Sequence, residues 1–107
     1  MKSRKQVADI MTAVFAECQN LRNAGQEEYA HSDENALSNF EHLASDLKLS
    51  REKILLVYFK KHYDGVVSWV NGHKSQREGV QGRINDMIVY LCLLRAMVED
   101  APSVGKG

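Results

Sequence analysis

The segment from Ser50 to Gly72 has the clearest pattern of hydrophobic and polar positions in the chain. Residues 54–59 form an unbroken apolar run, which covers every side of a helix and which only a buried helix tolerates. At about 100° per residue, most of the polar side chains that follow gather on one arc. They are Lys60, Lys61, Asp64, Ser68 and Asn71. His62 falls inside the apolar arc instead. The pattern predicts a central helix over residues 51–71, capped by Ser50 and ended by Gly72, with one histidine in its apolar face.

Two segments before this helix also carry apolar residues at helical spacing. Residues 3–24 have one continuous stripe, which predicts a helix on the outside of a core that ends at Gly25. The stripe consists of Val7, Ile10, Met11, Val14, Phe15, Cys18 and Leu21. A second helix is predicted over residues 33–48, where Ser32 or Asp33 can cap the first turn.

A fourth helix is predicted over residues 76–99. Its start has the spacing of a capping box at 75–78, although two glycines weaken the first turns. The tail over residues 101–107 is expected to fray. The fourth helix is too apolar for a small monomer, so we expect part of it, or of the central helix, to be buried in a dimer.

The four predicted helices and their short connections account for a single domain over residues 1–107. The sequence has no strand alternation, no internal repeat and no low-complexity segment. The predicted fold class is therefore all-α, a compact four-helix bundle that forms oligomers.

Composition narrows the classes of partner. Lysine plus arginine number 14 and aspartate plus glutamate number 14, so no net charge attracts nucleic acid or a membrane surface. Cys18 and Cys92 lack CxxC spacing and lie within apolar patterns, which predicts reduced core residues. The chain has no N-terminal hydrophobic segment and no apolar run near ~18 residues, so we expect neither a signal peptide nor a membrane span. The predicted location is the cytoplasm, which would be the host cytoplasm for a phage protein.

Candidate chemistry lies where a polar residue takes a place that the pattern gives to an apolar one. On the fourth helix, Arg83, Asp86 and Tyr90 form a column, and Asp86 falls well inside the apolar arc. A buried carboxylate without a partner costs several kcal/mol or stays protonated. We therefore expect Asp86 to meet Arg83, Lys61, His62, a ligand or a metal. A purely structural salt bridge or hydrogen-bond network is the alternative.

His62 has two interpretations of the same kind. It is either a satisfied core histidine or, beside Asp86, an oriented imidazole that contacts a ligand. Lys60 and Asp64 are expected to form an exposed i,i+4 pair, whereas Lys61 lies nearer the apolar edge and is better placed to reach an anion.

Acidic residues suggest a further possibility for metal binding. Glu27 and Glu28 precede the second helix and could supply oxygen ligands to Mg²⁺, together with Asp64 and Asp86. A solvated loop beside an acidic helix N-terminus is the alternative. The spacing does not match an EF-hand loop.

Three segments carry a family resemblance: EEYAHSDENALSNF, FKKHYDGVVSW and GRINDMIVYLCLL. Together they resemble nucleotide modification associated domain 1, a small all-α domain of phage and prophage genomes, over about residues 26–98. The resemblance implies matching positions at Tyr29, Asn39, Phe40, Lys61, Arg83, Asp86 and Tyr90. The sequence Glu-Glu-Tyr-Ala here lacks the aspartate and the glycine of that family's pattern.

The last helix is also similar to the closing helix of MazG-type all-α nucleoside triphosphate pyrophosphohydrolases. That family binds metal through paired Glu-x-x-Glu and Glu-x-x-Asp motifs. In this chain Arg83 stands where a metal-binding glutamate would be, and no Glu-x-x-Glu lies on a helix that could face Asp86. A magnesium cage needs several carboxylates, so we expect binding rather than hydrolysis.

The functional hypothesis is an interhelical pocket that binds a nucleotide-like anionic ligand, a role that would let a phage sequester it from host defence. Arg83 and Lys61 would contact phosphate, His62 and Tyr90 would stack or hydrogen-bond, and Asp86 would fix Arg83 or accept from a base. Tyr29 and Asn39 complete the predicted ligand-binding set. No catalytic residue and no cofactor is indicated.

Two alternatives from other classes stay open. One is a metal-dependent nucleotide pyrophosphohydrolase, in which Mg²⁺ would be held by the four acidic residues named above. The other is a protein–protein adaptor or inhibitor, which would bind a host protein and no small ligand.

Overall fold

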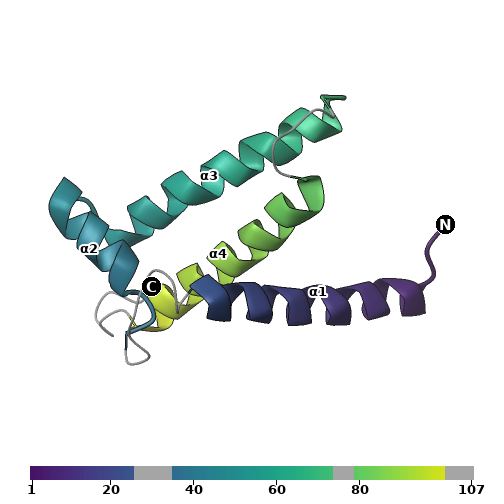
Figure 1. The fold of residues 1–107 in the computed structure, drawn as a ribbon, viewed down its shortest axis with the longest axis horizontal. Helices are drawn as coiled ribbons and strands as arrows, with labels where there is room; N and C mark the ends of the chain where they lie inside the picture. Colours follow the sequence, from purple (N-terminus) through teal and green to yellow (C-terminus); the bar gives the residue numbers. More distant parts are fainter. Residues whose placement is uncertain (26–34, 74–78, 101–107) are drawn as a thin grey trace.

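The computed structural model describes residues 1–25, 35–73 and 79–100, and in these ranges the chain forms four α-helices and no strand (Figure 1). They are α1 (Arg4–Gly25), α2 (Ser38–Leu47), α3 (Arg51–Val70) and α4 (Val80–Asp100). The predicted all-α class is confirmed. The predictions for the capping residues 32, 33 and 75–78 and for the tail 101–107 lie outside the described residues.

The helices α3 and α4 run in opposite directions beside each other and form the centre of the molecule (Figure 1). The short helix α2 packs against α3, and α1 packs along α4. Within the described residues α1 meets no other helix. The radius of gyration is 15.8 Å, compared with ~13 Å for a compact chain of this length. The arrangement is therefore more open than the predicted compact bundle.

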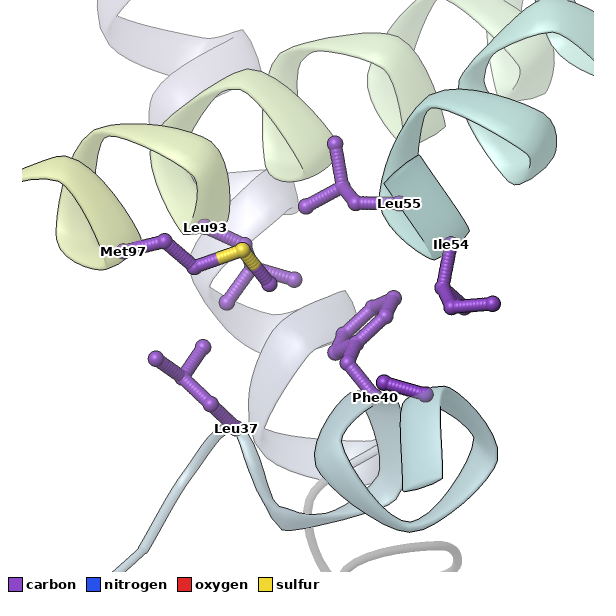
Figure 2. Close-up of a cluster of buried hydrophobic side chains, with 7 residues drawn as sticks. Leu37, Phe40, Ile54, Leu55, Leu93 and Met97 are labelled. Carbon is purple, nitrogen blue, oxygen red and sulfur yellow. The ribbon is translucent and has the colours of Figure 1, made fainter. Parts of the chain in front are cut away.

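The hydrophobic core lies where α2 meets the paired α3 and α4 (Figure 2). Its buried members are Leu37, Phe40, Ala44, Ile54, Leu55, Leu93 and Met97. Leu55 is fully buried and Met97 almost so. Three helices thus contribute to one cluster, which fixes the end of the α3–α4 pair nearest α2.

Local side-chain contacts explain where two helices begin. Ser50 caps α3 as predicted, because its Oγ accepts a hydrogen bond from the backbone N–H of Lys53 at 3.2 Å. The prediction that α2 begins at residue 33 is wrong for residues 35–37. There the Oδ1 of Asn35 accepts from the N–H of Leu37 at 3.1 Å, and this turn precedes the first helical residue, Ser38.

Glycine marks two further helix boundaries. Helix α4 begins at Val80 rather than at residue 76 as predicted, and Gly79 directly before it is not helical. After α3, Gly72 has a φ of +99°, which side chains other than glycine rarely adopt, so it ends the helix as predicted.

The prediction that α3 is buried on every side is wrong. Leu56, Val57 and Tyr58 are 50%, 65% and 40% exposed, although Ile54 and Leu55 beside them are buried. Of the described helices, α2 and α4 contact α3. Together they leave part of its circumference uncovered. The apolar run of the sequence therefore faces both core and solvent.

Candidate functional site

The α3–α4 interface places polar and aromatic side chains opposite one another at intervals of about one helical turn. Tyr58 lies against Tyr90, and His62 lies against Asp86. One turn further along α3, Gly65 lies beneath the side chain of Arg83. Each step forward along α3 is matched by a step backward along α4, as expected for an antiparallel pair with a fixed register. We call these residues the α3–α4 column.

The centre of the α3–α4 column is a histidine–carboxylate pair. The Nδ1 atom of His62 lies 3.5 Å from the Oδ2 atom of Asp86, and the two side chains are 10% and 24% exposed. Of the partners that the sequence offered for Asp86, the structure thus shows His62 in ion-pair range. At 3.5 Å Asp86 acts on the imidazole ring through its charge rather than through a short hydrogen bond.

Arg83 occupies the next turn of α4. A Cβ atom at residue 65 would overlap the Cδ and Nε atoms of Arg83, so the arginine side chain passes directly over the backbone of α3. Glycine leaves this space without displacing the arginine side chain. Arg83 is half-buried, and the aliphatic part of its side chain contributes to the packing of the two helices.

Aromatic rings make up the other end of the α3–α4 column. Tyr58 and Tyr90 are stacked, with ring centroids 6.2 Å apart and planes 11° from parallel. The ring of Phe40 from α2 meets both tyrosines edge-on, at 6.2 and 6.3 Å. The ring of His62 lies 5.7 Å from that of Tyr90 at an angle of 32°. Aromatic pairs in such geometries contribute beyond the area that they bury.

Sequence reasoning did not assign Tyr58 to the site. Its position four residues before His62 puts both on one face of α3, and that spacing is the signal that could have found it. Its ring contacts those of Phe40 and Tyr90, and Tyr58 is 40% exposed. The aromatic end of the α3–α4 column is therefore open to solvent at Tyr58.

Asn39 and Lys61 have different environments. The Oδ1 atom of Asn39 is buried and accepts no hydrogen bond from the described residues, next to Phe40 in α2. Buried acceptors in this state are uncommon in folded proteins. Lys61 is exposed on α3 beside His62. Tyr29, the last of the predicted ligand-binding residues, lies outside the described residues.

The predicted metal ligands are only partly described. Asp64 is 58% exposed and pairs with Lys60 at 2.6 Å, as the i,i+4 spacing predicted, while Asp86 pairs with His62. Glu27 and Glu28 lie outside the described residues. Within the part of the chain that the structure describes, no three His, Cys, Asp or Glu residues come close enough to hold a metal ion together.

A second feature is an apolar groove of about 480 Å³ between α1 and α4. Cys18 and Cys92 both line it, and both are free thiols. Cys18 is buried as predicted, and burial raises the pKa of its thiol, with smaller contributions from Cys92, Glu17 and Asp86. The prediction for Cys92 is wrong, because this residue is exposed on the groove wall.

Comparison with known proteins identified no matching family model, no matching curated protein and no matching solved structure. The two family resemblances therefore stay predictions. None of the described helices is both long and apolar enough to cross a membrane.

Proposed function

We propose that this protein binds a nucleotide-like anionic ligand at the α3–α4 column and releases it unchanged. The observation that supports this function is the order of groups along α4: a guanidinium at Arg83, a carboxylate on an imidazole at Asp86, and a stacked ring at Tyr90. These positions span about 10 Å of helix at 1.5 Å per residue, which is comparable to the length of a nucleoside monophosphate.

Each group suits one part of such a ligand. The guanidinium of Arg83 has five N–H donors, so it can donate hydrogen bonds to phosphate oxygens in addition to its contacts within the protein. Lys61, exposed on the neighbouring helix, adds a second positive charge. Tyr58 offers a half-exposed ring face for a base, and Asp86 accepts hydrogen bonds from an amino group.

Asn39 gives this proposal an additional support. Its buried Oδ1 atom lacks a donor among the described residues, and leaving such an acceptor unsatisfied costs about 1–3 kcal/mol. The adjacent Phe40 contacts both tyrosines of the column. A donor from a ligand would remove that cost if the ligand displaced the groups that bury this atom.

The wider role is part of the proposal. We propose a cytoplasmic phage-type protein that works as a homo-oligomer and withholds the ligand from host defence, as the resemblance to nucleotide modification associated domain 1 implies. Binding without hydrolysis accords with Arg83 at the position where the pyrophosphohydrolase motif has a carboxylate. A pyrophosphohydrolase would instead require several carboxylates around Mg²⁺.

Thermal unfolding in the presence of a nucleotide panel tests this function. The panel contains mononucleotides, cyclic nucleotides and ADP-ribose derivatives, each with and without Mg²⁺. A ligand at 100 times its Kd stabilises the native state by ~2.7 kcal/mol, which raises the melting temperature measurably. We expect such a shift, with intact ligand recovered afterwards by chromatography.

A matched pair of variants locates the binding site. Arg83→Gln should abolish the ligand-induced shift, whereas Arg95→Gln should leave it unchanged, because Arg95 lies on the same helix with a 76% exposed side chain paired to Glu99. Recovery of cleaved ligand would show the enzyme instead. An unchanged melting temperature across the panel would contradict ligand binding.

A protein–protein adaptor is the second candidate, and the uncovered face of α3 favours it. Leu56, Tyr63 and Val70 recur every seven residues along this helix and are 50%, 48% and 68% exposed. An amphipathic helix of a host protein could cover such a stripe. In that case Leu56→Asp would prevent capture of the host protein, while Arg83→Gln would not.

A further inference from the structure

The groove between α1 and α4 has apolar walls and one polar end. Its apolar lining residues are Phe15 and Cys18 on α1 and Ile88, Val89, Cys92 and Leu93 on α4. Its polar lining residues all lie in the C-terminal part of α1, and they are Gln19, Arg22 and Asn23. The volume of about 480 Å³ falls within the range of about 300–1,000 Å³ that is usual for small-molecule sites. Such sites also combine apolar walls with a few polar groups, as this groove does.

Arg22 places a positive charge at the polar end of the groove. Its Nη2 atom donates to the carbonyl oxygen of Ala36, in the turn before α2, at 2.6 Å, so a neutral backbone group helps to hold the guanidinium in position. Burial lowers the pKa of Arg22, and a smaller contribution from Tyr90 opposes this effect, so the surroundings disfavour the charged form. None of the described residues that line the groove is acidic. The polar end therefore favours a ligand that brings a negative charge.

The apolar part of the groove suits a hydrocarbon chain. Phe15 is 51% exposed, so its ring has surface that such a chain would cover. Between Phe15 and Asn23 helix α1 advances by about 12 Å at ~1.5 Å per residue, which is comparable to the extended length of a medium-chain acyl group. Removal of hydrocarbon from water is favourable and needs no further polar contact. The groove thus has separate places for a chain and for an anionic head.

We propose that this groove binds one free fatty acid of medium chain length, with its carboxylate at Arg22 and its acyl chain between Phe15 and α4. A guanidinium can donate two parallel hydrogen bonds to one carboxylate, here in addition to the contact with Ala36. Asn23, which also lines the groove, can supply an amide donor. No residue of the α3–α4 column lines the groove, so this binding does not depend on the function proposed for the column.

Isothermal titration calorimetry with decanoate, kept below the concentration at which it forms micelles, tests the site. We expect one molecule of decanoate to bind per chain. Decanol has the same chain without the charge, and it should bind roughly tenfold more weakly, because it loses the charge-assisted hydrogen bonds to the guanidinium. No binding of decanoate, or equal affinities for decanoate and decanol, would overturn the proposal.

Two matched pairs of variants test the head and the chain separately. Arg22→Gln should weaken decanoate binding roughly tenfold and leave decanol unchanged, whereas Arg4→Gln, at an exposed position of the same helix outside the groove, should affect neither. Cys92→Trp should fill the groove and abolish binding of both compounds. Leu91→Trp, at the neighbouring exposed position outside the groove, should not. Equal effects within either pair would contradict the proposal.

Alkylation of Cys92 locates the ligand in the wild-type protein and does not depend on how any variant folds. This exposed thiol lies on the groove wall, so saturating decanoate should slow its reaction with iodoacetamide. An unchanged rate would place decanoate elsewhere and overturn the proposal. Light scattering during the titration should show a constant mass. A dimer that dissociates as decanoate is added would show that a second copy occupies the groove, which would also overturn it.

Discussion

The Nδ1 atom of His62 on α3 lies 3.5 Å from the Oδ2 atom of Asp86 on α4, at the centre of the α3–α4 column. Their side chains are 10% and 24% exposed. This pair connects the two central helices through a polar contact that lies between the aromatic rings of Tyr58 and Tyr90 on one side and Arg83 on the other. Its loss would leave a nearly buried imidazole without the carboxylate.

Asp86→Ala should lower the free energy of unfolding by about 1–3 kcal/mol, because a buried polar group then loses its charged partner. Urea denaturation followed by circular dichroism measures the change. The control is Asp64→Ala, since Asp64 pairs with Lys60 on the surface and exposed pairs of this kind contribute only ~0.3–0.5 kcal/mol. Equal effects of both substitutions would show that Asp86 is not held in the interface.

Gly65→Ala should weaken ligand binding while leaving the stability of the fold nearly unchanged. An added Cβ would overlap Arg83 and force its guanidinium to move, whereas alanine in place of glycine favours a helix by ~1 kcal/mol. We expect a fold of nearly unchanged stability and a weakened ligand-induced shift in melting temperature.

The control for this prediction is Gly65→Ala introduced into Arg83→Ala. Without the arginine side chain the same substitution should stabilise the protein by ~1 kcal/mol. A double-mutant cycle from urea denaturation gives the coupling between the two positions. A coupling of zero would mean that Arg83 does not lie over this glycine.

Arg51 joins three helices and should contribute more than a surface arginine. Its guanidinium donates to Glu41 of α2 at 2.7 Å, to Glu52 at 3.2 Å and to Asp100 of α4 at 3.0 Å, with a side chain only 16% exposed. We expect Arg51→Ala to cost about 1.5–3 kcal/mol, the range of hydrogen bonds to charged groups. Arg95→Ala, which removes one exposed i,i+4 pair with Glu99, should cost ~0.5 kcal/mol or less.

The charge state of Arg51 determines how its contribution to stability depends on pH. Burial lowers the pKa of Arg51, but the hydrogen bonds to Asp100, Glu52 and Glu41 raise it more, so the pKa lies above its ordinary value. A raised pKa means that the folded state favours the charged form, and the resulting stability is present below the ordinary value and lost only above it. Deprotonation of Arg51 should therefore not affect unfolding measured between neutral pH and pH 10, and an Arg51-dependent loss in that range would contradict the assignment.

The two cysteines should differ in reactivity. Cys18 is buried, and burial raises the pKa of its thiol, whereas Cys92 is exposed. Iodoacetamide in mildly alkaline buffer should alkylate Cys92 first and Cys18 only after unfolding, because the thiolate is the reactive form. Mass spectrometry of the digested protein identifies the labelled residue. Equal labelling of both in the native protein would place Cys18 in solvent.

Several parts of this structure follow from local patterns. The cap at Ser50, the end of α3 at Gly72 and the buried position of His62 were all predicted, because helix periodicity and end chemistry depend on near neighbours in the sequence. The need of Asp86 for a partner also follows, since the cost of burying a carboxylate does not depend on the fold.

The sequence by itself thus determined that the chain forms four helices, although not where α2 and α4 begin, and which polar residues lie on apolar faces. Only the tertiary structure decided that His62 meets Asp86, that Arg83 crosses Gly65 and that Tyr58 stacks on Tyr90, because these contacts depend on the register of α3 against α4. It also decided that the stripe around Met11 is open while Cys18 is covered. A periodic pattern specifies that a face is apolar, but what covers that face depends on the crossing of helices distant in sequence.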